Sequence, residues 1–98
     1  MLANIIAKLK AKDGKKKELE ETCKKLAKEV HEKEEGCLKY ELFVSREDPN
    51  EIWVVEEYKD DNAIDEHMNS PHFNEAKEKF GELLAEEPEI NIIDRLND

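Results

Sequence analysis

Two side chains of this 98-residue sequence are suited to acid–base chemistry, His67 and Glu56. His67 lies on the apolar side of a short segment with helical spacing, and an imidazole titrates near neutral pH, as a general base requires. Glu56 lies in a stretch rich in apolar residues, IWVVEEY, where a buried carboxylate needs a partner. We therefore predict that Glu56 orients His67 or acts as a base itself. The alternative is structural: a half-buried His67 satisfied by Glu56, with Glu56 as an anchor.

Further residues could complete a substrate pocket around this pair. Tyr40 and Tyr58 could donate a hydrogen bond to a substrate oxygen, so both are catalytic candidates. The candidates for substrate binding are Asn4, Phe43, Trp53, Met68, His72 and Phe73. With Ile5, the apolar members of this set would form a cavity between helix and sheet. The aromatic residues could equally belong to the core or to a dimer interface, and His72 could form only a local hydrogen bond.

Metal binding is a weaker interpretation of the same residues. His67 and His72 are separated by four residues, and the acids near them are Asp65, Glu66 and Glu56. Such nitrogen and oxygen ligands suit Zn or Mn. However, Ser70-Pro71 interrupts the helix between the histidines, so they need not share a face, and we predict no metal site. The sequence has no GxGxxG, P-loop, GxSxG or HExxH motif, which leaves nucleotide cofactors and serine or zinc hydrolysis without support.

The apolar pattern predicts the elements that must position these side chains. Alternation of apolar and polar residues predicts strands over 2–10, 37–44, 52–58 and 89–96. Spacings of three and four predict helices over 15–33 and 60–69, and a further helix that restarts at Ser70-Pro71 and ends near residue 85. Asp13-Gly14 is expected to form a turn that can cap the first helix, and Gly36 to end that helix in the left-handed conformation.

This order of elements is the split βαβ, or ferredoxin-like, pattern: one α+β domain over 1–98, with a four-stranded antiparallel sheet and helices on one face. Both faces of the first three strands contain apolar residues, for example Ile5 beside Ile6 and Trp53 beside Val54. Since helices cover only one face, the other would form an apolar patch larger than monomers usually tolerate. The sequence therefore predicts a homodimer packed sheet to sheet.

Charge dominates the composition and excludes several functions. There are 26 acidic and 16 basic residues, for a net charge of −10, while Leu, Ile, Val and Phe together number 23. That apolar content is just enough for folding. A surface of this sign repels phosphate backbones, and no stretch approaches a membrane span or a signal peptide, so neither nucleic acid nor a membrane is expected as a partner. We expect a cytoplasmic protein with Cys23 and Cys37 reduced; a redox pair of the two is the minor alternative.

Three blocks of the sequence resemble the antibiotic biosynthesis monooxygenase family. They are EGCLKYEL over 35–42, VEEYKD over 55–60 and AIDEHMNSPHF over 63–73. The corresponding family patterns are E-x-G-C-x-x-Y, E-x-W/Y and A-x-x-x-H-x-x-S-x-H-F, in the same order and at the same spacing. The resemblance covers residues 2 to 95 and implies a small dimeric α+β barrel.

The resemblance also implies an activity. The family includes quinol and polyketide monooxygenases that use no metal, flavin or haem, so it implies a cofactor-independent monooxygenase that oxidises a small quinol-like or polyphenolic substrate with O2. Haem-degrading members exist, but here the position of their haem ligand corresponds to Lys77, a poor ligand while protonated. Two alternatives remain. One is an isomerase for a small phosphorylated sugar, which needs Lys39 or Lys77 to point inward, and the other is a non-enzymatic dimeric module that binds a small ligand.

Overall fold

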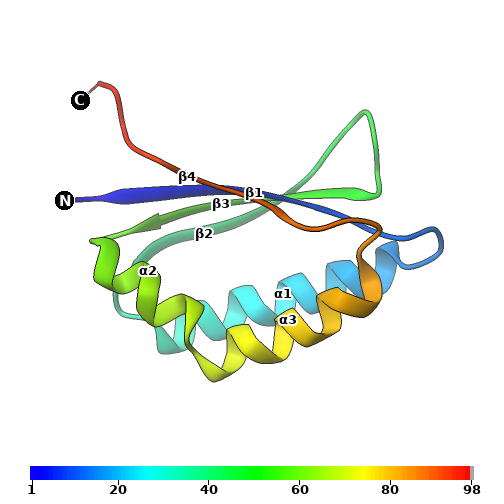
Figure 1. Cartoon of the computed structure of the whole chain (residues 1–98), viewed down its shortest axis with the longest axis horizontal. Helices are drawn as coiled ribbons and strands as arrows, with labels where there is room; N and C mark the ends of the chain where they lie inside the picture. Colours follow the sequence, from blue (N-terminus) through cyan, green and yellow to red (C-terminus); the bar gives the residue numbers. More distant parts are fainter. Residues whose placement is uncertain (98) are drawn as a thin grey trace.

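In the computed structural model, which describes residues 1–97, the chain forms four strands and three helices. In chain order they are β1 (Ala3–Lys10), α1 (Lys16–Lys33), β2 (Cys37–Val44), β3 (Glu51–Tyr58), α2 (Asp61–Met68), α3 (Pro71–Leu83) and β4 (Glu89–Ile93). The strands form one antiparallel sheet in the order β2-β3-β1-β4, and all three helices lie on the same side of it (Figure 1). The predicted ferredoxin-like α+β fold is confirmed.

Side-chain caps cause the break between α2 and α3. The side chain of Asp60 accepts a hydrogen bond from the backbone N–H of Ala63, at the start of α2. Ser70 does the same for the backbone N–H of Phe73, at the start of α3, and Pro71 occupies the first helical position, where a missing N–H costs nothing. The predicted restart of the helix is therefore confirmed, and it places a sharp turn between His67 and His72.

Two predictions about the ends of α1 are wrong. Lys15 occupies the N-cap position without a side-chain hydrogen bond, so the Asp13-Gly14 turn does not cap the helix. Among residues 1–97 only Gly14 has a positive φ, so Gly36 is not left-handed. Gly36 serves packing instead, because a Cβ at this position would lie 2.6 Å from the Cβ of Ala63. The absence of a side chain lets α2 approach the start of β2.

The core lies between the helices and one face of the sheet. Strict alternation turns one set of residues of β1 and β3 toward the helices: Ala3, Ile5, Ala7, Leu9, Ile52, Val54, Glu56 and Tyr58. The buried stripe of α1 consists of Leu19, Cys23, Leu26 and Val30. Burying each large apolar side chain of this kind contributes about 1.5–3 kcal/mol. The alternation therefore places Glu56 in the core, among apolar neighbours.

The last strand is shorter and more exposed than predicted. β4 ends at Ile93 rather than near residue 96, because Ile93 pairs with Asn4 and little of β1 remains beyond that pair. Ile90 and Ile92 face the same side as the helices, yet they are 48% and 61% exposed. The helices thus leave this edge of the sheet uncovered. No helix within residues 1–97 has both the length and the apolar character to cross a membrane.

Candidate functional site

A cavity of about 530 Å³ separates part of α3 from the sheet. Its walls are mainly apolar and come from β1, β3, α1 and α3: Ile5, Ala7, Leu9, Val54, Cys23, Leu26, Phe73, Phe80 and Leu84. Tyr40, Glu56 and His67 interrupt these apolar walls, and three charged residues, Lys77, Glu86 and Glu87, also line the cavity. The cavity opens to solvent between α3 and β4, where exposed residues line it. A cavity of this volume, apolar with a few polar groups, is typical of a small-molecule site.

His67 is held in one orientation by Glu34, the residue that ends α1. The Nδ1 atom of His67 lies 2.8 Å and 3.1 Å from the two carboxylate oxygens of Glu34. Since a carboxylate only accepts, Nδ1 carries the proton and Nε2 is left as the acceptor. Phe73, Tyr58 and Tyr40 surround the ring, with centroid distances of 4.9, 5.6 and 5.7 Å. The prediction that Glu56 pairs with His67 is wrong, because that partner is Glu34.

Glu34 binds a second histidine as well. Nε2 of His72 lies 2.5 Å from Oε2 of Glu34, so two imidazoles donate to one carboxylate. Burial alone would raise the pKa of Glu34, but the hydrogen bonds from His67 and His72 outweigh it and hold this pKa below its ordinary value. Glu34 is therefore ionised at neutral pH and links α1, α2 and α3 through one buried network.

Glu34, His67 and His72 also form a group that could hold a metal ion. Within residues 1–97, one possible ligand atom from each of the three lies within 4.8 Å of the others. The histidines of the sequence-based metal interpretation do come together, but around Glu34; Asp65 and Glu66 are exposed and outside the group. The hydrogen bonds between the imidazoles and Glu34 already satisfy these buried groups.

Three polar atoms remain free to meet a ligand. Tyr40 and Glu56 are cross-strand neighbours, and Tyr58 donates to Oε1 of Glu56 at 2.5 Å. Within residues 1–97 no hydrogen bond is seen for Tyr40 Oη, Glu56 Oε2 or His67 Nε2, and no side-chain nitrogen or oxygen is both enclosed and unpartnered. These three atoms therefore reach the accessible surface of the cavity that their residues line.

Burial sets the protonation of the two groups beside His67. It raises the pKa of Glu56, outweighing the hydrogen bond from Tyr58, and it raises the pKa of Tyr40 well above its ordinary value. Tyr40 therefore remains a hydrogen-bond donor at neutral pH. Glu56 takes up a proton more readily than an exposed carboxyl group.

Replacing Glu56 with glutamine should make the protein less sensitive to alkaline pH. A carboxyl group whose pKa is raised by folding stabilises the folded state below its unfolded pKa, and this contribution is lost as pH rises through the folded pKa. The glutamine side chain cannot ionise and keeps an acceptor for Tyr58. The difference in melting temperature between Glu56→Gln and wild type should shift by roughly 3–5 °C in favour of the variant as the pH rises from 5 to 8. The control is Glu57→Gln, on the other face of β3; a parallel pH profile for wild type and Glu56→Gln would refute the argument.

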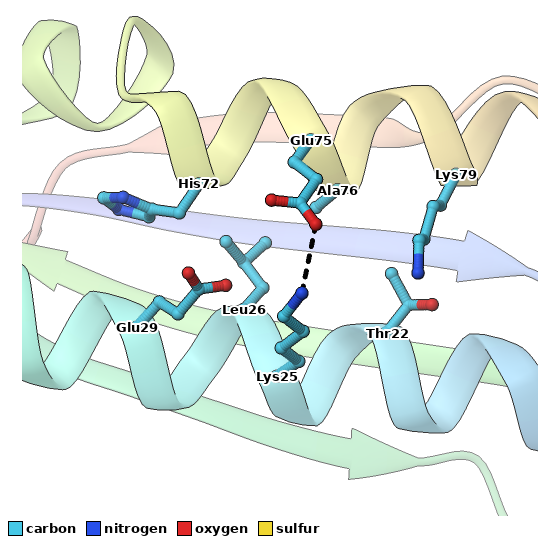
Figure 2. Close-up of a pocket in the computed structure, with 8 residues that line it drawn as sticks. All are labelled: Thr22, Lys25, Leu26, Glu29, His72, Glu75, Ala76 and Lys79. Carbon is cyan, nitrogen blue, oxygen red and sulfur yellow. Dashed lines mark hydrogen bonds and ion pairs between the residues drawn. The ribbon is translucent and has the colours of Figure 1, made fainter.

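The structure brings together some of the predicted substrate contacts. Met68 and Phe73 line the cavity with His67. Tyr58 is fully buried and supports Glu56 rather than lining the cavity. His72 does not line the cavity; it lies beside a groove of only about 20 Å³ between α1 and α3 that Lys25 and Glu75 bridge (Figure 2). This groove has room for about one water molecule, so it is not a substrate site.

The structure separates three other predicted contacts from this cavity. Asn4, Phe43 and Trp53 lie on the outer face of the sheet, opposite the helices. The reason is the period of two along a strand: Phe43 and Trp53 each neighbour a residue that faces the helices, so they face the other way. The expectation that Phe43 and Trp53 line a cavity between helix and sheet is therefore corrected, whereas Asn4 lies on the predicted side, away from Ile5.

Glu34 is the functional residue that the sequence analysis missed. Glu34 follows a long helix rich in lysine and glutamate. Nothing in the local sequence distinguishes it from the exposed acidic residues around it. The available signal was the family pattern E-x-G-C-x-x-Y, whose first position falls on Glu34 when Gly36, Cys37 and Tyr40 are aligned.

The two cysteines are free thiols and give no support to the redox alternative. Burial raises the pKa of Cys23 to about 12 and that of Cys37 to about 11. Since the thiolate is the reactive form, both thiols are unreactive at neutral pH. Cys23 contributes to the cavity wall as a small apolar side chain.

The fold and the site together define a small ferredoxin-like α+β protein whose apolar cavity contains a histidine–carboxylate pair. The model of the antibiotic biosynthesis monooxygenase family matches residues 3–79, and the chain belongs to this family. The matched segment includes Glu34, Tyr40, Glu56 and His67, so the site lies within the family domain.

Individual relatives agree with this assignment. The Mycobacterium tuberculosis protein named "Putative monooxygenase Rv0793" is 34% identical over 65 residues, which are 66% of this chain and 63% of that protein. The chain thus spans less than two thirds of this relative's length. The solved structure of Rv0793 superposes with a TM-score of 0.93 at 24% identity, covering 100% of this chain and 98% of the other, and so shares the fold. A conserved protein from Methanosarcina mazei Go1 has a TM-score of 0.89 at 36% identity, covering 95% and 91% of the two chains.

Proposed function

We propose that the protein is a cofactor-independent monooxygenase that oxidises a small quinol-like or polyphenolic substrate with O2. The observation that carries the proposal is the convergence of His67 Nε2, Glu56 Oε2 and Tyr40 Oη on one apolar cavity, with His67 oriented by Glu34. Membership of the family and the name of the Mycobacterium tuberculosis relative support monooxygenase chemistry.

The arrangement suits a reaction that begins with deprotonation of the substrate. Nε2 of His67 accepts the proton of a substrate hydroxyl, and Glu34 stabilises the imidazolium that forms. Tyr40, protonated at neutral pH, donates a hydrogen bond to the developing oxyanion. Glu56, the cross-strand neighbour of Tyr40, offers a second polar contact for the substrate.

The substrate anion itself supplies the electrons for O2. One electron passes from the anion to O2, and the resulting radicals combine to form a carbon–oxygen bond and a peroxide. Cleavage of the O–O bond then leaves one oxygen atom on the ring and releases the other as water. The two protons of this water come from the substrate hydroxyl, returned by His67, and from the ring C–H. The apolar walls keep bulk water from the anion while the reaction proceeds.

O2 consumption tests the proposal directly. Purified protein is mixed with a panel of hydroquinones, such as menadiol and 1,4-dihydroxynaphthalene, and O2 uptake is followed with an electrode in parallel with mass spectrometry of the products. We expect uptake above the autoxidation rate and a product that has gained one oxygen atom from 18O2. The absence of enzyme-dependent uptake across the panel would contradict the proposal.

The two alternatives have less support. An isomerase for a phosphorylated sugar needs inward lysines, but Lys39 lies on the outer face of the sheet and only Lys77 lines the cavity. A dianionic phosphate would also meet three carboxyl groups there, those of Glu56, Glu86 and Glu87. The non-enzymatic dimeric module would be favoured by a filled core with no cavity beside His67, whereas a large cavity adjoins this residue.

We also propose that two copies pack sheet to sheet. The outer face has no helix over it in Figure 1, and it contains the exposed side chains of Leu2, Phe43 and Ile93 beside the half-buried Ile6, Trp53 and Val55. Lysines and glutamates are interspersed among them, for example Lys8 and Glu57, so the face can complement itself about a two-fold axis.

Replacing Phe43 with lysine should separate the two copies. Phe43 lies on the edge strand β2 opposite Trp53, and a lysine there would bury a charge in the interface. Sedimentation velocity should show a dimer for wild type and a monomer for Phe43→Lys at micromolar concentration. Val44→Lys is a matched control, because Val44 is equally exposed, at 51%, but faces the helix side. A monomeric wild type would contradict the proposal.

A further inference from the structure

One charged side chain lies within the otherwise apolar face that α3 presents to the cavity. This face consists of Phe73, Lys77, Phe80, Gly81 and Leu84, which recur at spacings of three and four. Lys77 is the only lysine or arginine that lines the cavity within the described chain. It is exposed at the open side of the cavity, whereas His67 lies at the closed side, against Phe73.

The surroundings of Lys77 leave its ammonium group available. Within residues 1–97 no ion pair is seen for Lys77, while Lys25 on α1 pairs with Glu75 of α3 at 3.0 Å. Gly81 lies one turn further along α3, and a Cβ built there would meet no atom within 4 Å. The space at Gly81, one turn from Lys77 on the same face of α3, is therefore open.

His67 of α2 and Lys77 of α3 line the same cavity at different positions. The ring of His67 contacts Phe73, and Lys77 follows Phe73 by four residues, about 6 Å along the helix axis. A flat ligand lying along α3 would thus meet Nε2 of His67 with one end and the ammonium of Lys77 with the other. The apolar side chains between these ends, Phe73 and Phe80, would contact its rings.

We propose that Lys77 forms an anion subsite at the mouth of the cavity, and that the substrate is an aromatic alcohol or diol with one carboxylate group opposite its reacting hydroxyl. This inference rests on the proposed function for the identity of the reacting end. It specifies a monoanion because Glu86 and Glu87 line the same mouth and oppose a second negative charge.

Binding of matched ligands, measured by calorimetry under nitrogen so that no turnover occurs, tests the subsite. The ligands are 2-naphthol, 6-hydroxy-2-naphthoate and 6-hydroxy-2-naphthyl phosphate, which share one ring system and differ in charge. We expect wild type to bind the carboxylate about fivefold more tightly than the neutral alcohol, as for a partly exposed ion pair. Lys77→Met should abolish this preference and change 2-naphthol affinity less than twofold, and Lys77→Glu should reverse the preference.

Lys79→Met is the matched control, since Lys79 lies on the same helix but lines the groove toward α1 (Figure 2). This variant should keep the preference of wild type. The subsite would be overturned if wild type bound the neutral and carboxylate ligands equally, or if the preference survived in Lys77→Met. It would also be overturned if wild type bound the phosphate ester more tightly than the carboxylate, or bound none of the ligands. A Lys77-dependent carboxylate preference without O2 uptake would uphold the subsite and refute the monooxygenase proposal.

Discussion

Replacing His67 with asparagine should lower the rate of O2 consumption by about 10²- to 10⁴-fold, the usual effect of removing a general base. Asparagine can place its amide N–H near the position of Nδ1, so the hydrogen bond to Glu34 has a replacement. It has no acceptor in the place of Nε2, the atom that faces the cavity. The loss should appear in kcat, with a smaller change in KM, because the apolar walls that bind the substrate remain.

The control for this experiment is the third histidine of the chain. His31 lies on α1 and is exposed, so His31→Asn should retain wild-type activity. Circular dichroism and a melting curve should show that both variants are folded. If His67→Asn consumes O2 at a rate within about threefold of wild type, His67 is not the base and the mechanism fails.

Replacing Glu34 with alanine should have the largest effect on stability. The substitution leaves the N–H groups of two buried imidazoles without their acceptor, and each unsatisfied group costs about 1–3 kcal/mol. We therefore expect the free energy of unfolding to fall by roughly 2–4 kcal/mol, and activity to fall with it because His67 loses its orientation. Glu35→Ala is the control, because Glu35 is the exposed neighbour in the chain.

The destabilisation of Glu34→Ala should depend on pH in a defined direction. The pKa of Glu34 is lowered by folding, so its contribution to stability is present above the ordinary value of 4.5 and is lost as pH falls through the lower folded value. Urea unfolding of wild type and variant should therefore differ most near pH 7 and converge at acidic pH. A difference that is constant from pH 7 to pH 3 would show that Glu34 acts through packing alone.

Glu34→Gln separates orientation from stability. Glutamine keeps a carbonyl oxygen that accepts one of the two imidazole N–H groups, so the fold should be less affected than in Glu34→Ala. It carries no negative charge to stabilise an imidazolium at His67, so kcat should still fall, by about tenfold or more. Wild-type kcat in Glu34→Gln would assign Glu34 a structural role only.

The predictions from sequence succeeded where the physical cause is local. The alternation in β1 and β3, the caps at Asp60 and Ser70, and the placement of Glu56 in the core all follow from periods of two or 3.6 residues and from side chains that bond their own backbone. Strand and helix assignments were therefore close, and the split βαβ order leads to the sheet that is observed. The errors in element ends concern the Asp13-Gly14 cap, Gly36 and the end of β4, and for the last two the deciding partner belongs to another element. The predicted pairing of Glu56 with His67 failed because the actual partner, Glu34, comes from a distant part of the chain. Phe43 and Trp53 were assigned to the cavity although the alternation along their own strands turns them to the outer face.

The periodicity of the chain is enough to place a histidine, a carboxylate and a tyrosine on the apolar side of a ferredoxin-like sheet, because it decides which face a side chain takes. The choice of the carboxylate that binds His67 depends instead on long-range packing. Glu34 and Glu56 are 33 and 11 residues from it along the chain, and the packing of α2 against the end of α1 brings the more distant one within 2.8 Å. The cavity between α3 and the sheet likewise depends on long-range packing, since the space between two elements is set by all the side chains that hold them apart.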